Sequence, residues 1–264
     1  MVKILMHGCN GHMGQVITRL VEAEADMEII AGVDVSDHIS NAYPVYKSLE
    51  DYRQACGQDG SLLADVAIDF SSAAAVDKLL DYCEAQLMPS VLCTTGLSPE
   101  QLERVKALGI IPSFFLAHVY HWGDIHLKNL GQKRAERISP AHSALEHGIR
   151  FTLHQDAPVI RPDMMETVWC AVNRMTRNGV ILGTEERISV ADALKAVTIN
   201  GAYQYFEEGK KGSIAPGKLA DFVILEQNPL EADPMDLRKI RVLATIKEGT
   251  CIYRADGQET GEVR

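Results

Sequence analysis

Three glycines near the start of the sequence have the spacing of a phosphate-binding turn. Gly8, Gly11 and Gly14 lie in the segment GCNGHMG, directly after the apolar run from Lys3 to His7. In such a turn the first glycine permits a tight bend, the second lets the backbone approach a pyrophosphate, and the third lets the next helix pack closely on the sheet. The helix start also offers free N–H groups to phosphates. The pattern predicts a dinucleotide site, with a purely structural turn as the alternative.

An acidic residue follows at the distance expected for a ribose. Asp34 closes the second apolar run, 20 residues after Gly14. A carboxylate in this place accepts hydrogen bonds from the adenosine ribose and repels a 2′-phosphate. We therefore expect NADH or NADPH as the cofactor, with a preference toward NADH.

Short apolar runs and helix-length segments alternate over the first 108 residues, which is the βαβ pattern of a parallel sheet buried on both faces. Ser98 can cap the last of these helices, because Pro99 stands at its first position. The expected strands run over Lys3 to His7, Glu28 to Asp34, Val66 to Phe70 and Ser90 to Thr94, and the expected helices over His12 to Ala25, Ala74 to Gln86 and Pro99 to Ala107.

Composition predicts a globular protein of one large or two modest domains. The sequence has 264 residues, of which 46% are apolar, which is ample material for hydrophobic cores. It has no apolar run long enough to span a membrane, and its beginning does not read as a signal peptide. Its six cysteines include no CxxC pair. We therefore expect a cytoplasmic address, reduced thiols and no membrane partner.

Charge and histidine are distributed unevenly along the chain. Residues 1–108 carry 7 Lys and Arg against 16 Asp and Glu, and they account for nearly all of the net charge of -10. Six of the nine histidines fall between residues 118 and 154. A charge of this sign argues against a nucleic-acid partner, and the unevenness suggests two parts, 1–108 and 109–264, with different origins or tasks.

The segments GCNGHMG, AIDFSS and CTTGLSPEQLERV together resemble the N-terminal domain of 4-hydroxy-tetrahydrodipicolinate reductases, which are enzymes of lysine biosynthesis. The resemblance implies an oxidoreductase-like domain that binds NADH or NADPH. For Ser71 and Thr94, capping of strand ends is an equal alternative. The residues that the resemblance assigns to cofactor binding are Gly8, Asn10, Gly11, His12, Met13, Gly14, Asp34, Phe70, Ser71, Thr94, Thr95 and Gly96.

The substrate half of that reductase family is not recognisable in this sequence. The family holds and protonates its dicarboxylate substrate with a histidine pair, a lysine and a serine-glycine-threonine segment, and no HHxxK-like stretch follows residue 108. A hydride donor that lacks these groups should turn over poorly. We therefore expect impaired or absent reductase catalysis.

The second part resembles the C-terminal portion of metal-dependent hydrolases of the amidohydrolase-3 type. The segments that carry this resemblance are GIIPSFFLAHVYHWGD, RISPAHSALEHGIRFTLHQDAPV and ALKAVTINGAYQYFEEGKKGSIAPGKLADFVIL. It implies the last units of a TIM barrel, followed at 212–264 by part of a small β-sandwich. It assigns His118 to a metal-ligand position and Asp156 to the acid that orients or deprotonates the attacking water.

Such a metal centre needs about three protein ligands and one open position. The sequence contains no HxH motif, which supplies the first ligands in this family. His118 and Asp156 are therefore expected to be an unused histidine and a strand-end carboxylate, and zinc or another divalent metal is the less expected cofactor.

Further helices are expected at Met164 to Arg177 and Val190 to Glu208, the second capped by Ser189. A meander is expected from the strands Ala220 to Glu226, Val242 to Glu248 and Thr250 to Tyr253. Its open edge would favour aggregation or a homo-oligomer.

The two parts join between a predicted helix and a predicted strand, and both families accept this arrangement at the junction. We predict an α/β fold, with one doubly wound, Rossmann-like parallel sheet of about six strands in the order 3-2-1-4-5-6, followed by helices and the small meander. IIPSFFLA and RFTLH would be the fifth and sixth strands, which would bring His118 and Asp156 to the crevice of the glycine turn.

Three functions remain in competition. The first is a reductase-like protein that binds NAD(P)(H) with impaired catalysis. The second is a metal-dependent amidohydrolase that acts on C–N bonds and completes its site with a partner chain. The third is a fusion without catalysis.

Overall fold

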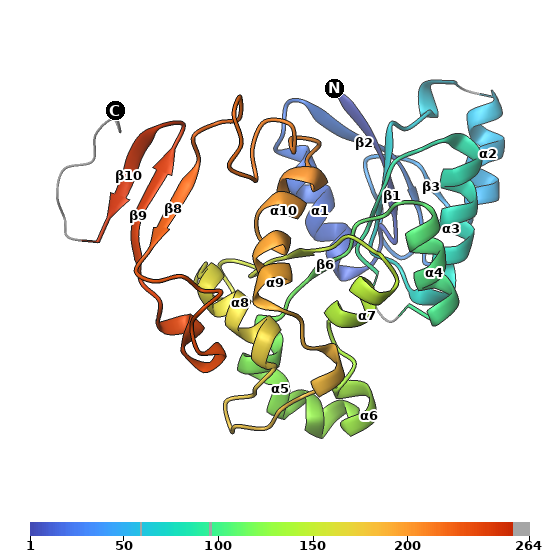
Figure 1. Ribbon diagram of the computed structural model, residues 1–264. Coiled ribbons are helices and arrows are strands. Elements are labelled where there is room, and N and C mark those ends of the chain that lie inside the picture. Colours follow the sequence, from blue (N-terminus) through green and yellow to red (C-terminus); the bar gives the residue numbers. More distant parts are fainter. Residues whose placement is uncertain (59, 95–96, 256–264) are drawn as a thin grey trace. The chain divides into compact units, whose positions relative to one another are not determined.

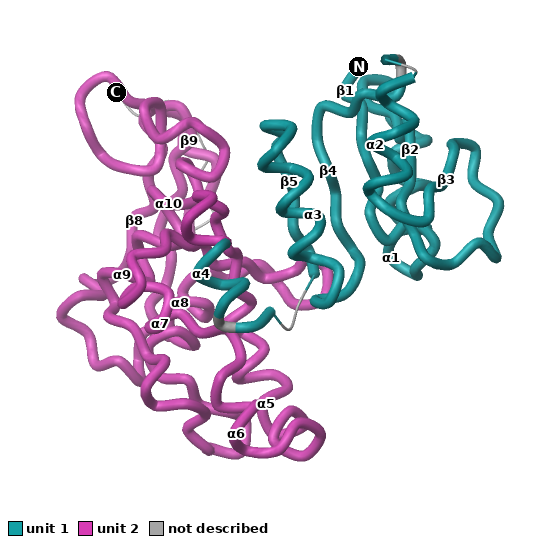
Figure 2. Tube along the Cα trace, turned by 90° about the vertical axis from the view of Figure 1, so that its right-hand side faces the viewer, with its two compact units in different colours: residues 1–104 teal, residues 105–264 magenta. Residues whose placement is uncertain are grey.

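A computed structural model describes residues 1–58, 60–94 and 97–255. The chain forms two compact units, Met1–Arg104 and Val105–Arg264, which Figure 2 shows in different colours. The described part of the first unit has one sheet and that of the second has two, and each unit has its own hydrophobic core. The two units are therefore described one after the other.

The first unit is built on a five-stranded parallel sheet in the order β3-β2-β1-β4-β5. The central strand β1 is almost wholly buried, as expected for a strand covered on both faces. The strands are β1 Val2–His7, β2 Met27–Val33, β3 Val45–Tyr46, β4 Val66–Asp69 and β5 Ser90–Leu92.

Helices connect these parallel strands and cover the sheet (Figure 1). They are α1 His12–Glu22, α2 Leu49–Gln58, η1 Gly60–Leu62, α3 Ala73–Gln86 and α4 Pro99–Ala107. Leu5 and Ala67 of the sheet pack with Tyr52 of α2 and Leu79 of α3 in one core cluster. Leu5 and its neighbours Ile4 and Met6 are all buried, so residues that alternate in direction along β1 are covered on both sides.

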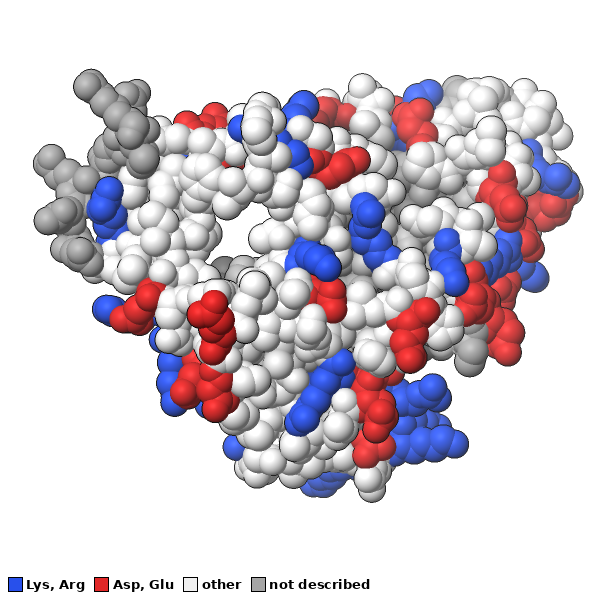
Figure 3. Space-filling model, viewed as in Figure 1, with Lys and Arg blue, Asp and Glu red and all other residues white. Residues whose placement is uncertain are grey.

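Acidic side chains gather on the outer side of α3, toward the right-hand edge of Figure 3. Arg104 of α4 pairs with three of them, at 3.8 Å from Asp77, 2.6 Å from Asp81 and 3.3 Å from Glu84. The predicted cap of α4 is confirmed, because the backbone N–H of Gln101 donates to Ser98 Oγ and the Gln101 side chain accepts from the Ser98 N–H.

The second unit contains a two-stranded parallel sheet, β6 Ser113–Phe114 and β7 Thr152–Leu153, surrounded by helices. Trp169, Phe151 and Leu116 are among the large, fully buried apolar side chains of its core. Arg174 lies fully buried beside them and donates to four backbone carbonyls. The helices are α5 Ala117–Leu130, α6 Gln132–Ala135, α7 Ala141–Glu146, α8 Met164–Asn173, η2 Thr184–Glu186, α9 Val190–Ala196, α10 Ile199–Gln204 and η3 Pro234–Lys239.

The expected meander is present as an antiparallel sheet in the order β10-β9-β8. Its strands are β8 Phe222–Leu225, β9 Val242–Lys247 and β10 Thr250–Arg254. Phe222, Ala244, Ile246 and Cys251 form a small core on one side. β8 and β10 are the edge strands.

The prediction of one sheet of about six strands is wrong. IIPSFFLA and RFTLH contribute β6 and β7, which pair with each other instead of extending the first sheet. The strand count also missed β3, which occupies the third place in chain order beside β2. The predicted order 3-2-1-4-5-6 is also wrong. It placed Val66 to Phe70 beside the second strand and Ser90 to Thr94 beside the first, whereas β4 pairs with β1 and β5 pairs with β4. In the described part of the chain, no helix has the length and apolar character needed to cross a membrane.

Candidate nucleotide site and histidine cluster

The glycine turn joins β1 to α1 and leaves no room for side chains at two of its positions. Gly8 has φ +79°, and a Cβ there would lie 2.6 Å from the carbonyl oxygen of Phe70. A Cβ on Gly14 would lie 2.3 Å from the carbonyl oxygen of Gly8. The sequence therefore folds into this turn only with glycine at both positions, as predicted for a close helix–sheet approach.

The start of α1 has unused backbone donors. Gly11 is its N-cap, with no side-chain cap, and no acidic residue lies in the first turn. His12 and Met13 begin the helix and are exposed. The first N–H groups of the helix and its positive end are therefore available to an anion.

Asp34 lies beside the turn and holds its backbone. Its Oδ2 accepts from the Asn10 N–H at 2.9 Å, and its Oδ1 accepts from the Ser36 N–H at 2.9 Å. The Asn10 side chain donates to the Ser36 carbonyl at 2.6 Å and accepts from Asn41. The loop after β2 is thus fixed to the glycine turn, and each carboxylate oxygen retains a lone pair for a ribose hydroxyl.

The carboxyl ends of β1 and β4 carry a buried pair that sequence reasoning missed. His7 Nδ1 lies 2.7 Å from Asp69 Oδ1, and the same oxygen accepts from the Ser71 hydroxyl at 2.6 Å and from the Ser71 N–H at 3.2 Å. Burial would raise the pKa of the Asp69 carboxyl, but the hydrogen bonds from His7 and Ser71 outweigh it and leave the pKa below its usual value. Asp69 thereby orders Ser71 next to the glycine turn.

The expected nicotinamide side is only partly described. A Cβ on Gly8 would meet the Phe70 carbonyl and the Ser71 N–H, so these residues border the turn. The Oγ1 of Thr94 and the Oδ2 of Asp69 are buried; within the described part of the chain neither makes a hydrogen bond of good geometry, although Thr94 lies close enough to Asp69 to lower the pKa of its carboxyl. Thr95 and Gly96 lie outside the described residues. Free hydrogen-bonding capacity at these strand ends fits a bound cofactor or water.

In the second unit, His118 and Asp156 belong to a cluster around Phe115. The His118 ring lies 4.4 Å from the ring of Phe115 and 5.2 Å from that of His126. The His154 ring stacks on that of Phe115 with centroids 5.3 Å apart, and its Nδ1 lies 2.8 Å from Ser113 Oγ. Sequence reasoning selected His118 and Asp156 and noted the i, i+2 spacing of His154 and Asp156, but it did not place His126 with them.

Electrostatics shows that these groups influence one another. Burial, followed by the neighbouring His126, lowers the pKa of His118, while Asp156 opposes the shift. Burial also lowers the pKa of His154, again against Asp156. Both imidazoles are therefore biased toward the neutral form, which can act as an acceptor.

The cluster does not fit a metal ion as it stands. Over residues 1–58, 60–94 and 97–255, no group of three or more His, Cys, Asp or Glu side chains is arranged to hold one. His154 is engaged by Ser113, and His118 packs against aromatic rings. No chemical step that requires a metal is therefore derived for these residues.

Comparison with known sequences matches both parts of the chain. Residues 65–253 match the model of the amidohydrolase family, and residues 2–117 match the model of the dihydrodipicolinate reductase N-terminus. The chain belongs to the amidohydrolase family, and it carries a reductase-like N-terminal part. It is thus a two-part chain of the kind that the sequence motifs indicate.

Individual relatives likewise fall into two groups, reductases and amidohydrolases. A 4-hydroxy-tetrahydrodipicolinate reductase of Clostridium tetani is 38% identical over 106 residues, which are 40% of this chain and 38% of the relative. An N-substituted formamide deformylase of Arthrobacter pascens is 28% identical over 205 residues, which are 73% of this chain and 37% of the relative. The chain therefore spans less than half of the length of each.

Among solved structures, a metal-dependent hydrolase from Pyrococcus horikoshii aligns with a TM-score of 0.55 over 88% of this chain and 45% of its own. The sequence identity in that alignment is 21%. A hydrolase from Pyrococcus furiosus aligns with a TM-score of 0.52 and 20% identity. Likeness at this level concerns the fold alone.

Proposed function

We propose that the first unit binds NADH or NADPH, and that the chain acts as a reductase-like, nucleotide-binding protein. The observation that carries this proposal is the glycine turn, where side chains are excluded at Gly8 and Gly14 next to an uncapped helix start. The start of α1 also has no side-chain cap and no acidic residue in its first turn, so nothing there competes with a phosphate for the free N–H groups. The pyrophosphate would lie on Gly11 and the first turn of α1.

Asp34 would bind the adenosine ribose of this cofactor. Its carboxylate is already oriented by the N–H groups of Asn10 and Ser36. A preoriented acceptor loses little conformational entropy when it meets a hydroxyl. NADH is the preferred form in this proposal, because a 2′-phosphate beside the same carboxylate would be repelled.

The nicotinamide end would lie against Phe70, Ser71 and Thr94. The bound cofactor supplies the hydride, and the residues of this chain orient the ring and exclude water. Asp69 would hold the Ser71 hydroxyl in place through their 2.6 Å hydrogen bond. We propose that reductase turnover is impaired, because residues 109–264 contain no HHxxK-like segment to bind and protonate a dicarboxylate.

Fluorescence titration with NADH and NADPH tests this function. We expect saturable binding of both, with the lower Kd for NADH. Bound cofactor should also stabilise the protein, by about 2.7 kcal/mol when its concentration is 100 times the Kd. The absence of saturation up to about millimolar cofactor would refute the proposal, since such binding would be weaker than about 4 kcal/mol.

A metal-dependent hydrolase is the second candidate, favoured by the family match over residues 65–253 and by the mutual influence of His118, His154 and Asp156. An N-substituted formamide is the substrate class to test, after the name of the Arthrobacter relative. Stoichiometric zinc in the purified protein together with formamide hydrolysis would support this function. Metal content near zero and no hydrolysis would eliminate it.

We further propose self-association through the edges of the small meander. β8 and β10 are its outer strands, and Val223, Ile224 and Ile252 on them are 57%, 50% and 55% exposed. Open strand edges with apolar side chains favour pairing with a second copy. Light scattering over a concentration series should show a dimer, and a monomer at every concentration would contradict this.

A further inference from the structure

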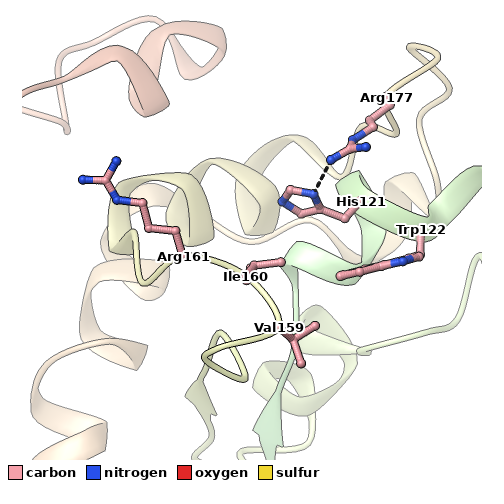
Figure 4. Close-up of a pocket in the computed structure, with 6 residues that line it drawn as sticks. All are labelled: His121, Trp122, Val159, Ile160, Arg161 and Arg177. Atoms are coloured by element: carbon pink, nitrogen blue, oxygen red, sulfur yellow. Dashed lines mark hydrogen bonds between the residues drawn. The ribbon is translucent and has the colours of Figure 1, made fainter.

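A cavity of about 300 Å³ lies in the second unit next to the histidine cluster, since Trp122 on its wall packs against the His118 ring at 5.3 Å (Figure 4). It is bounded by His121 and Trp122 of α5, by residues 159–161 before α8, and by Arg177 after α8. Ligand sites in proteins begin at about this size. Neither the nucleotide proposal nor the predicted metal residues involve these side chains.

Arg177, His121 and Glu166 form a hydrogen-bonded chain along one wall. Arg177 Nη2 lies 2.8 Å from His121 Nδ1, and His121 Nε2 lies 2.6 Å from Glu166 Oε1. A guanidinium only donates, so His121 Nδ1 must accept and His121 Nε2 must carry the proton that Glu166 accepts. The hydrogen bonds therefore fix the orientation of the His121 ring, and both of its ring nitrogens are engaged.

In this hydrogen-bonded chain the positive charge of Arg177 is not paired with a negative charge. One of its five N–H groups meets the imidazole of His121, and the guanidinium carbon lies 5.7 Å from the centre of the Tyr120 ring; throughout the described residues no carboxylate lies within 4.0 Å of the Arg177 or Arg161 guanidinium. The planar fork of an arginine matches a carboxylate in bidentate geometry. Arg161 extends away from the other five residues in Figure 4, so it lies at the rim and adds long-range attraction.

The remaining walls are apolar. Val159 is 55% exposed, and Ile160 and Trp122 are partly buried beside it. An exposed branched side chain next to an indole ring gains free energy when a hydrocarbon group covers it, by about 25 cal/mol per Å² of buried apolar surface. The cavity thus combines one open cationic fork with an apolar floor.

We propose that this cavity binds a small carboxylate that carries an aromatic or branched aliphatic group. The carboxylate pairs with Arg177, which His121 and Glu166 hold in place, and the hydrocarbon group packs on Val159, Ile160 and Trp122. A neutral molecule of the same shape would lose the paired charge and bind less tightly.

The test uses the full chain with phenylacetate as the probe and phenethyl alcohol as its neutral counterpart. Trp122 borders the cavity, so tryptophan fluorescence and ligand-observed NMR report on binding. We expect saturation by phenylacetate in the range of about 1 mM or below, and binding of phenethyl alcohol at least about tenfold weaker. Absence of phenylacetate binding at about 10 mM, or equal binding of the two probes, would overturn the proposal.

Two variants and one control assign the site. Arg177→Gln should weaken phenylacetate about tenfold or more by removing the cationic fork. Val159→Glu should weaken it by a similar factor by placing a negative charge on the wall; Val159 is exposed, so this change should not disturb folding. Arg134→Gln on α6 is the control and should leave the Kd unchanged.

Unchanged affinity in both Arg177→Gln and Val159→Glu would refute this location. NADH titration of Arg177→Gln separates the two proposals, because NADH binding should not change in that variant. Thermal unfolding of each variant shows whether it is folded, and Val159→Glu keeps the test valid if Arg177→Gln is unstable.

Discussion

Replacement of Gly14 by alanine puts the most direct strain on the nucleotide turn. The new Cβ would lie 2.3 Å from the Gly8 carbonyl oxygen and 2.6 Å from that of Cys9. An unstrained carbon–oxygen contact is about 1 Å longer, so α1 must move by roughly that distance. Overpacking of this kind costs about 1–3 kcal/mol of unfolding free energy. The same shift moves the first N–H groups of α1, and we expect NADH binding to weaken at least about tenfold.

Gly57→Ala is the matched control for this prediction. Gly57 lies in α2, and no atom comes within 4 Å of the position of its Cβ. Alanine there should stabilise the protein by about 0.5–1 kcal/mol and leave NADH binding unchanged. Urea denaturation followed by circular dichroism gives the free energies, and fluorescence titration gives the Kd values. If Gly14→Ala unfolds at the wild-type urea concentration and binds NADH normally, the reasoning about the turn is wrong.

Four further outcomes are expected. Asp34→Asn should weaken NADH about tenfold and NADPH less, because an amide cannot accept from both N–H groups; Asp37→Asn, at an exposed ion pair, should change neither Kd in the same titration. The unfolding free energy should fall as the pH drops below about 6.5. The pKa values of His118 and His154 are lowered in the folded state, so the unfolded chain binds more protons at these two residues. Urea titrations from pH 8 to about 5.5 measure this dependence, and an unfolding free energy that does not change with pH would contradict it. Arg174→Leu should cost about 3–5 kcal/mol in the urea assay, because one buried and three partly buried backbone carbonyls lose a charged donor. Dialysis against a chelator should leave the melting temperature unchanged, and a fall would instead reveal a structural metal.

The first unit was largely predictable because its strands are short, buried apolar runs between helices of ordinary length. The predicted strand starts and ends lie within two residues of β1, β2, β4 and β5. β3 was missed because it has only two residues, Val45 and Tyr46, and so shows no periodicity.

The second unit was harder to predict because its strands owe their pairing to tertiary contacts. Pro112 has no N–H group to donate to a ladder, so the run IIPSFFLA yields only Ser113–Phe114 as strand. The helix expected over Val190 to Glu208 breaks at Thr198, whose hydroxyl bonds the Leu194 carbonyl at 2.6 Å. Phe206, within the range expected to be helical, lies beyond the end of α10 with φ 58° and is 90% exposed.

Among the site residues too, local sequence patterns could be predicted, whereas pairings between distant residues could not. The glycines and Asp34 could be selected because their spacing is local and carries a mechanism. The pairing of His7 with Asp69 joins residues 62 positions apart, and that of His121 with Glu166 joins residues 45 apart. An acid at the end of the buried run AIDF was a signal for Asp69, but no sequence pattern names its partner.

Fluorescence titration of the full chain with NADH tests the central claim most directly. We predict a saturable signal that is lost or strongly weakened in Gly14→Ala and retained in Gly57→Ala. A titration without saturation up to about millimolar NADH, in a folded wild-type protein, would contradict nucleotide binding at the glycine turn.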